Sequence, residues 1–506
     1  MAEPNDDETA LVARVLEVAG GNPGLQKVLY RPILAGEFPV AREALDAVAR
    51  WKASGELPAE ESAAQEFFQR VSFEIYRNAL TPTQKSQLWA ATLFSEGLPV
   101  PLQVLEAVGR ASGVGNPRVA IDRLRGLGLM DDWDEIDGVT HVALNPLARP
   151  LADSSLTDKE QGYLAAAAIA PLAAAWQSPE GYFPSDPRGV EAARLALQGS
   201  APAEVVERTA LAAGTFLFHR EHDAKGALAM LEAARAKIDE EGKEPSPQFL
   251  LLGSQCAERI GEWDLQITLL ERGLVLHSED RVGLAQIAVT HASATIAQEG
   301  PDKALARLKD AVVLFGEACD EHSRAVTMGK IADILEGRGE TDEALRIRRE
   351  EQLPVFERLG DVRSRAVTMG KIADILEGRG ETDEALRIHI EERLPTAEAI
   401  KDLDGIAHIR FACAQLRLTR GGLKLGEAQT IYDELAESFA ILQKLQRIDG
   451  IAVVGSMFGQ ILAMGGYPDE ALTVLDQSAM AFEKMQQTQQ AAQVRDLQQR
   501  IREEQG

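Results

Sequence analysis

The sequence has few of the residues on which β-rich, disulfide-bonded and metal-binding domains depend. Aromatic residues make up 5% of the 506 residues, whereas a large β-sandwich or barrel needs aromatic and β-branched faces. The three cysteines (Cys256, Cys319 and Cys413) lie far apart in apolar helical stretches, with no CxxC pair and no metal-ligand spacing. We therefore expect an all-α protein whose thiols are buried in a reducing compartment.

Positive charge and long apolar runs are also scarce. Lys and Arg together number 53 against 79 Asp and Glu, a formal net charge of −26. An acidic surface repels nucleic-acid phosphates and anionic membranes. The longest uncharged run, 163–176, is too short to cross a bilayer, and the acidic start MAEPNDDETA lacks the apolar core of a secretory signal. We expect a cytoplasmic protein that binds no membrane and is not a general nucleic-acid binder.

A repeat of about 41 residues fills the second half of the chain. Residues 323–347 read SRAVTMGKIADILEGRGETDEALRI, and residues 364–388 repeat this segment in full. The small residue of the phrase G-x-x-D-E-A-L recurs at Ala227, Ala304, Ala344, Ala385, Ala428 and Ala471, with a degenerate copy around Gln266. Nineteen residues before four of these lies another alanine: Ala285, Ala325, Ala366 and Ala452. Seven copies at spacings near 40 residues indicate an array of similar units.

Each copy predicts two helices. In the first helix, apolar residues recur at helical spacing from Ala325 to Leu335, and the Gly-Arg-Gly segment 337–339 ends it. Residues 341–343, Thr-Asp-Glu, begin the second helix with acidic side chains at the positive end of its dipole. Because no single pair buries its own apolar face, neighbouring pairs should stack into a solenoid, predicted over residues 203–506.

This pattern resembles the tetratricopeptide repeat, in the longer-period form found in kinesin light chains and many bacterial signalling proteins. In one copy the matching positions are Ile331, Ala332, Leu335, Gly339, Asp342, Glu343, Ala344 and Leu345. Met328 stands where the family usually has a tryptophan. The resemblance covers about residues 203–500, and it implies about seven helix pairs and a surface that binds a protein or peptide partner.

The resemblance also implies a binding surface, because the first helix of each pair lines a concave groove in this family. The positions expected to face the groove are Val326, Gly329, Asp333 and Glu336, followed by Val367, Gly370, Asp374 and Glu377. We expect the binding set to be Lys330, Asp333, Glu336, Lys371, Asp374 and Glu377. Two alternatives stay open: these charges form a solvated face, and the two near-identical copies reflect recent duplication alone.

Residues 79–152 follow a different pattern, since no 40-residue period extends before residue 200. TPTQKSQLWAATLFSEGLPVPLQVLEAVG predicts two helices split by a Gly-Leu-Pro turn, and NPRVAIDRLRGLGLMDDW predicts a third. DEIDGVTHVALN predicts a β-hairpin that turns at Asp137-Gly138. Three helices followed by a hairpin are typical of a winged helix. Residues 153–202 are expected to be a helical connector and a Pro-, Gly- and Ser-rich linker.

Residues 1–78 are expected to be helical and contain LVARVLEVAGGNPGLQKVL at 11–29. A helix, the GGNPGL turn and a second helix resemble the lid of STAND-class signalling ATPases, relatives of NB-ARC proteins, which combine a lid and a winged helix with C-terminal repeats. The chain has no G-x-x-x-x-G-K-[ST] phosphate loop, and too few residues precede Gly20 for a nucleotide-binding domain. Asn145 stands where the family has a phosphate-contacting histidine. We therefore expect no catalysis and no cofactor, with Pro23 starting a helix.

Two smaller sets of residues carry alternative chemistry. His219 and His222, in FHREHD, could share a helix face as metal ligands, but a third and fourth ligand are lacking and we expect solvated histidines. Arg118, Arg123 and Arg125 lie on the third predicted helix, which could enter a DNA major groove.

The combined prediction is a protein-binding adaptor or sensor without catalytic activity, acting in a bacterial signalling or defence assembly, a setting that rests on the family resemblance. A transcription regulator that uses the winged helix on DNA, and the regulatory half of a split STAND ATPase, are the alternatives.

Overall fold

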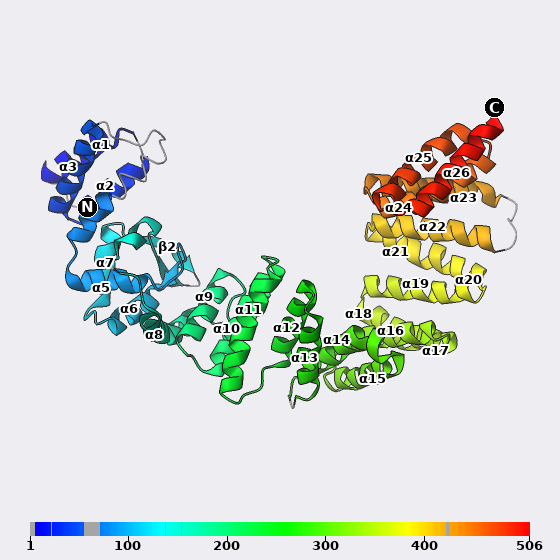
Figure 1. The fold of residues 1–506 in the computed structure, drawn as a ribbon, viewed down its shortest axis with the longest axis horizontal. Helices are drawn as coiled ribbons and strands as arrows, with labels where there is room; N and C mark the ends of the chain where they lie inside the picture. The colour runs from blue at the N-terminus through cyan, green and yellow to red at the C-terminus, as the bar shows by residue number, and fades with distance from the viewer. Residues whose placement is uncertain are drawn as a thin grey trace. The chain divides into compact units, whose positions relative to one another are not determined.

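The computed structural model describes residues 6–21, 23–54, 71–136, 138–152, 154–276, 278–420 and 426–505, and over these the chain is helical apart from one small sheet (Figure 1). The chain forms two compact units, Met1–Ser278 and Glu279–Gly506. The division falls inside the region predicted as one solenoid, and the limits given above for smaller domains stay predictions. Among the described helices, none combines the length and the apolarity that crossing a membrane requires.

The first unit begins with helices α1 (Asp6–Ala19), α2 (Pro23–Leu34) and α3 (Phe38–Ser54), followed by a helical segment at 71–78. Leu11 and Val15 of α1 and Leu25 and Leu29 of α2 are buried in one apolar cluster. Helix α2 begins at Pro23, as predicted, because a proline at the first helical position loses no intrahelical hydrogen bond. Asn22, in the lid-like motif, lies outside the described residues.

A compact block of helices and strands follows. Its elements are α5 (Pro82–Ala91), β1 (Val100–Pro101), α6 (Leu102–Ala111), α7 (Pro117–Gly126), β2 (Met130–Ile136) and β3 (Val139–Leu144). The three predicted helices and the hairpin are present. Strand β1, which pairs with β3 to complete the antiparallel order β1-β3-β2, was not predicted. Ile136 pairs with Val139, so the chain reverses at the predicted turn. Asp137 of that turn lies outside the described residues.

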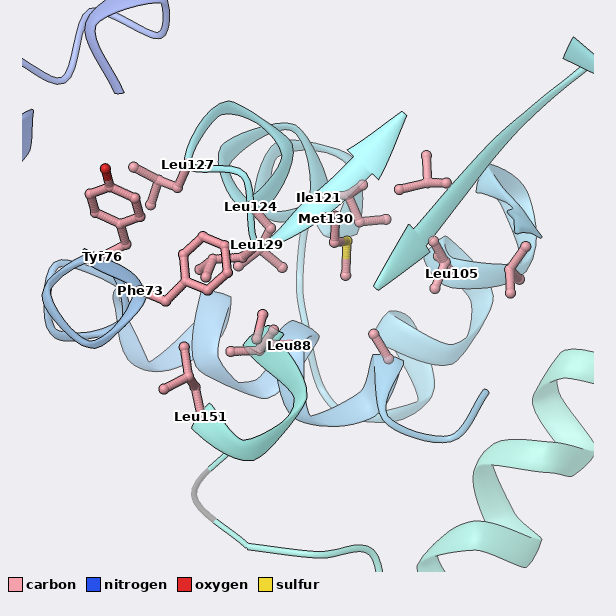
Figure 2. Packing of buried hydrophobic residues seen from close by; sticks show 14 of the residues in the cluster. Phe73, Tyr76, Leu88, Leu105, Ile121, Leu124, Leu127, Leu129, Met130 and Leu151 are labelled. Carbon is pink, nitrogen blue, oxygen red and sulfur yellow. The ribbon is translucent and has the colours of Figure 1, made fainter. Parts of the chain in front are cut away.

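The helices and the sheet of this block share an apolar core. Figure 2 shows Leu88 of α5, Leu105 of α6, Ile121 of α7 and Met130 of β2 directed into the space between these elements, and each is at most 2% exposed. Apolar side chains from every element are therefore removed from water, which is the main favourable contribution to folding.

The predicted connector carries more structure than expected. After η1 (Pro146–Leu151) and α8 (Asp158–Trp176), the Pro- and Gly-rich stretch contains a further helix, α9 (Pro187–Gln198). Helix α9 packs against α8 and α10 and buries Ala192, Ala193, Leu195 and Ala196. Asp186 caps its first turn, and Pro187 occupies its first position, so the Asp-Pro dipeptide begins a helix here.

Two helix pairs complete the first unit: α10 (Ala203–His219) with α11 (Ala224–Glu240), and α12 (Pro247–Ile260) with α13 (Trp263–Leu274). Helix α10 ends at His219, and His222 lies beyond it with a left-handed backbone. The helical i, i+3 spacing considered for a metal site is therefore not formed. The described residues hold no group of three or more potential metal ligands.

Five helix pairs stack one on the next in the second unit (Figure 1). The first helices are α14 (Arg281–Glu299), α16 (Glu321–Gly337), α19 (Val362–Gly378), α22 (Leu403–Thr419) and α24 (Ile448–Met464). The second helices are α15 (Pro301–Glu317), α17–η2–α18 (Thr341–Arg346, Ile347–Gln352, Leu353–Leu359), α20–η3–α21 (Thr382–Arg387, Ile388–Arg393, Leu394–Ala399), α23 (Glu427–Lys444) and α25 (Pro468–Lys484). Helix α26 (Thr488–Gln505) ends the stack. Over the described residues, the two units therefore hold the seven pairs predicted.

The anchor alanines are buried in five of the six copies, with exposures of 0 to 1% at Ala227, Ala304, Ala344, Ala385 and Ala471. Ala428 is exposed, which corrects the alignment of that copy. Ile431, one turn later, is 2% exposed and occupies the inward position, since Leu435 and Ser438 follow it at the spacing that Leu475 and Ser478 have after Ala471.

Asp residues begin most first helices of the second unit. Asp280, Asp320, Asp361 and Asp402 each accept a hydrogen bond from the backbone N–H three residues later. The residue before the cap takes a left-handed backbone at Cys319, Gly360 and Lys401, which ends the preceding helix. Cys319 is therefore an exposed turn residue, contrary to the expectation of three buried thiols, whereas Cys256 and Cys413 are buried.

Two second helices contain a π-helical segment, η2 at 347–352 and η3 at 388–393, which the repeat pattern did not predict. Each is followed by a Leu-Pro dipeptide, with Pro354 and Pro395 in the next turn. A proline cannot donate to the carbonyl four residues back and collides with it. A π turn changes the partner of that carbonyl and allows the helix to continue.

Candidate functional site on the first helices of the second unit

A row of exposed side chains runs across the first helices of the second unit. Val326, Val367, His408 and Val453 each follow the inward alanine of α16, α19, α22 and α24. The valines are 39%, 59% and 47% exposed in chain order, and His408 is also exposed. We call the surface formed by this row, together with the next two turns of each helix, the first-helix face.

The six predicted binding residues all lie on α16 and α19 in this face. Lys330, Asp333, Lys371, Asp374 and Glu377 are exposed, and Glu336 is partly buried. The Nζ atom of Lys371 lies 3.8 Å from Oδ1 of Asp333, which shows that the two helices present these charges side by side. The prediction that they bind a partner stays a prediction.

Gly329 and Gly370 do not face a groove, which corrects their predicted orientation. Both are buried, and each lies against the second helix of its own pair. A Cβ atom at Gly329 would approach Nε2 of Gln352 to 2.4 Å, and one at Gly370 would approach Cζ of Arg393 to 2.8 Å. A small residue is needed at both positions because a polar side chain of the second helix packs directly against the first helix there.

In the first of the two near-identical pairs, a buried arginine neutralises the acidic residues of the face. Arg348 is 2% exposed, and its Nη2 atom donates to Oδ1 of Asp333 at 2.6 Å and to Oε2 of Glu336 at 3.4 Å. Gln352 donates from Nε2 to the Ala325 carbonyl at 2.9 Å. Hydrogen bonds to a buried guanidinium are among the stronger interactions of a folded protein, so these carboxylates have a structural role.

The second pair lacks this neutralisation, although its first helix has the same residues. His389 and Arg393 stand where the first pair has Arg348 and Gln352. Burial, and to a lesser extent the positive charges of Arg393 and His408, lower the pKa of His389 to about 4, so its ring is neutral at pH 7. Burial lowers the pKa of Arg393, and the negative charge of nearby Asp374 opposes this shift in part. Among the described residues, however, no basic side chain lies within 4 Å of the carboxylates of Asp374 or Glu377.

The sequence analysis missed a pocket of 370 Å³ between α22 and α24. Phe411, Leu442, Val453 and Val454 form its apolar part. Arg447 lies at its rim, 2.6 Å from Oδ1 of Asp404 and 2.9 Å from Oδ2 of Asp449. Extending the 41-residue period one copy further would have identified only its α22 side, where His408, Phe411 and Gln415 are the counterparts of Val367, Gly370 and Asp374.

The arginines considered for DNA binding are engaged within the first unit. Arg118 lies 3.3 Å from Asp122, and Arg125 contacts both Asp122 and Asp132. Arg123 forms an ion pair with Glu37 and is partly buried, and this burial lowers its pKa. These cations are therefore already neutralised by carboxylates of the same chain.

Asn145, where the resemblance to STAND-class ATPases implied a phosphate-contacting histidine, holds two elements together. Its Nδ2 atom donates to Oδ2 of Asp131 at 2.9 Å, and its Oδ1 atom accepts from the Leu147 N–H at 3.0 Å. The other oxygen of Asp131 accepts from Arg31 of α2 at 2.7 Å. Arg31, Asp131 and Asn145 line a pocket of 540 Å³ together with Lys27 and Trp133. In this pocket, the Arg31 guanidinium is already paired with the carboxylate of Asp131.

No protein-family model matches the chain, and no curated protein matches it. Among solved structures, the chain is similar to a STAND protein with a tetratricopeptide repeat sensor from Pyrococcus horikoshii, with 14% identity over 97% of this chain and 72% of that one, at a TM-score of 0.47. It is similar to the apo form of RapI, with 16% identity over 56% of this chain and 99% of that one, at a TM-score of 0.40. Aspartyl phosphate phosphatase F from Bacillus subtilis has 10% identity over 99% and 96% of the two chains, at a TM-score of 0.38.

Proposed function

We propose that this protein is a non-catalytic adaptor or sensor subunit that binds a protein or peptide partner through the first-helix face. The observation that carries the proposal is that Val326 and Val367 are exposed at matching positions on the neighbouring first helices α16 and α19, and Val453 at the matching position on α24, with exposed His408 of α22 between them in the row. Groups of exposed apolar side chains within a polar surround mark interaction sites on proteins. The row continues into the pocket between α22 and α24, to which Val453 itself contributes.

The architecture of the chain supports a role in relaying the bound state. The first unit has the helices of the lid-like segment and the order helix, strand, helix, helix, hairpin that is typical of a winged helix. We assign these to a lid and a winged helix, and the 41-residue pairs to tetratricopeptide repeats of the kinesin light chain type. This combination suits a cytoplasmic bacterial signalling or defence assembly.

Site-specific photo-crosslinking in the native cell tests the proposal. A photoreactive amino acid is placed at Val326, Val367 or Val453, and in a matched control at Val313, which is 60% exposed on the second helix α15. The first-helix positions should each give one discrete adduct with the same partner, and Val313 should give none. The same adduct from Val313, or no adduct from any position, would contradict the proposal.

A further inference from the structure

We propose that the first-helix face takes a peptide segment with one basic and one apolar side chain, and that the second near-identical repeat supplies the carboxylates for the basic residue. The apolar side chain occupies the pocket between α22 and α24. This inference rests on the proposed function, because it names the partner chemistry of the same face.

The assignment of the basic residue follows from the difference between the two repeats. Asp333 and Glu336 already accept hydrogen bonds from buried Arg348. Asp374 and Glu377 have the same position and spacing on α19 and are exposed, but His389 replaces that arginine. Partly buried Arg393 interacts electrostatically with Asp374 but forms no ion pair with it. The second repeat therefore leaves two carboxylates, one helical turn apart, available to a cation of a partner.

The pocket supplies the apolar half of the recognition. Its volume of 370 Å³ and its apolar part, formed by Phe411, Leu442, Val453 and Val454, suit a side chain of an extended peptide. At the rim, Arg447 forms ion pairs with both Asp404 and Asp449. The rim therefore offers no unpaired cation to attract an acidic residue.

The geometry sets the distance between the two side chains. Packed helices lie about 8–10 Å apart, and the pocket begins one helix beyond α19. An extended peptide advances about 3.3 Å per residue. The basic and apolar residues should therefore be separated by about three to five positions. The net charge of −26 favours approach of a basic segment, and this attraction should weaken as salt increases.

Peptide binding to the full chain tests the chemistry. The probes are fluorescein-labelled Gly-Ser decapeptides that carry one Arg and one Leu, separated by one to seven positions, and they are followed by fluorescence anisotropy. Peptides with Glu in place of Arg, or Ser in place of Leu, are the controls. The Arg and Leu peptides should bind at least tenfold more tightly than either control, best at intermediate separations. Equal binding of the Glu peptide would overturn the inference.

A pair of matched variants tests the assignment to the second repeat. The double variant Asp374→Asn/Glu377→Gln should lose at least fivefold in affinity for the Arg and Leu peptide, with a smaller drop in melting temperature than the matched variant of the first repeat. Asp333→Asn/Glu336→Gln should melt at a lower temperature, because Arg348 loses its acceptors, yet keep its affinity within twofold. Equal losses of affinity in the two variants would refute the assignment.

A swap of the second-helix residues gives an independent check. His389→Arg/Arg393→Gln gives the second repeat the pair that the first repeat has, so the new arginine should occupy Asp374 and Glu377. The variant should bind the Arg and Leu peptide at least fivefold more weakly, with cooperative melting retained. Unchanged affinity would overturn the inference.

Crosslinking separates the two proposals. Adducts from the first-helix face without a preference for the basic peptide would remove this inference alone. Failure of the crosslinking experiment would remove the proposed function as well.

Discussion

Small side chains set the distance between the two helices of each pair. Ala344 is fully buried where its second helix meets the first, whereas Ala428, at the same place in the sequence motif, is exposed. Ala344→Leu should lower the free energy of unfolding by about 1–3 kcal/mol, because an overpacked interface forces neighbouring side chains and backbone to move. Ala428→Leu should change it by less than about 0.5 kcal/mol. Denaturant unfolding measures both, and equal effects would contradict the assignment of Ile431 as the inward residue of that copy.

A buried histidine should make stability depend on pH. The pKa of His389 is lowered to about 4 by burial, whereas an unfolded histidine titrates near 6.5. As the pH falls from about 6.5 to about 4, the unfolded chain binds a proton that the folded chain does not. Stability should therefore be complete above this range and fall by up to about 3 kcal/mol across it. In His389→Gln this slope should be smaller.

His408 does not serve as a control for this titration, because its charge helps to lower the pKa of His389. The comparison is therefore between the parent and His389→Gln. Carboxylates with a lowered pKa, such as Asp361 at about 2, are present in both proteins and cancel in the difference. Parallel curves for the parent and His389→Gln would contradict the role of His389.

The helices were predictable where the sequence repeats, and less so where a local feature interrupts a pattern. Apolar spacing and glycine ends were sufficient for α16 and α19, because one stripe per helix is buried between neighbours. The π segments depend on Pro354 and Pro395, which end the helical pattern in sequence although the helix continues. Helix α9 was missed because its flanking prolines and glycines are typical of a loop.

Capping of the first helices gives a test at this scale. Asp361 accepts a hydrogen bond from the Ser364 N–H at 3.0 Å, which together with the Ser364 hydroxyl lowers its pKa to about 2. Asp361→Ala should lower the free energy of unfolding by about 0.5–2 kcal/mol, because a helix N–H loses its acceptor. Asp361→Asn keeps the acceptor and should lose less than the alanine variant. Equal losses in thermal or denaturant unfolding would exclude a capping role.

At the scale of the molecule, the sequence predicted which helices carry the six candidate residues but not the charge state of those residues. The period put all six predicted residues on α16 and α19. Arg348 and His389 lie on the second helices. Whether their side chains reach the first helix depends on how the two helices pack, which the sequence pattern does not reveal. The pocket between α22 and α24 was missed because those repeats have diverged from the pair that defined the pattern.

The overall charge and the internal ion pairs together argue against DNA binding. Arg118, Arg123 and Arg125 contact Glu106, Glu37, Asp122 and Asp132, in a chain of net charge −26. Binding to DNA phosphates would require breaking these ion pairs and bringing an acidic surface close to DNA. Both steps cost free energy, and so few cations release too few counterions to offset that cost. We expect no sequence-specific duplex binding at physiological salt.

Footprinting on genomic fragments and anisotropy with random duplexes measure this prediction. The matched variant is Arg118→Ala/Arg123→Ala/Arg125→Ala. It should melt at a lower temperature, because Glu37 loses its partly buried partner, without a change in DNA binding. A protected sequence that is lost in this variant while cooperative folding is retained would reverse the conclusion, since the arginines would then exchange their carboxylates for phosphates on binding. Such a result would assign sequence recognition to α7, and sensing to the first-helix face of the second unit.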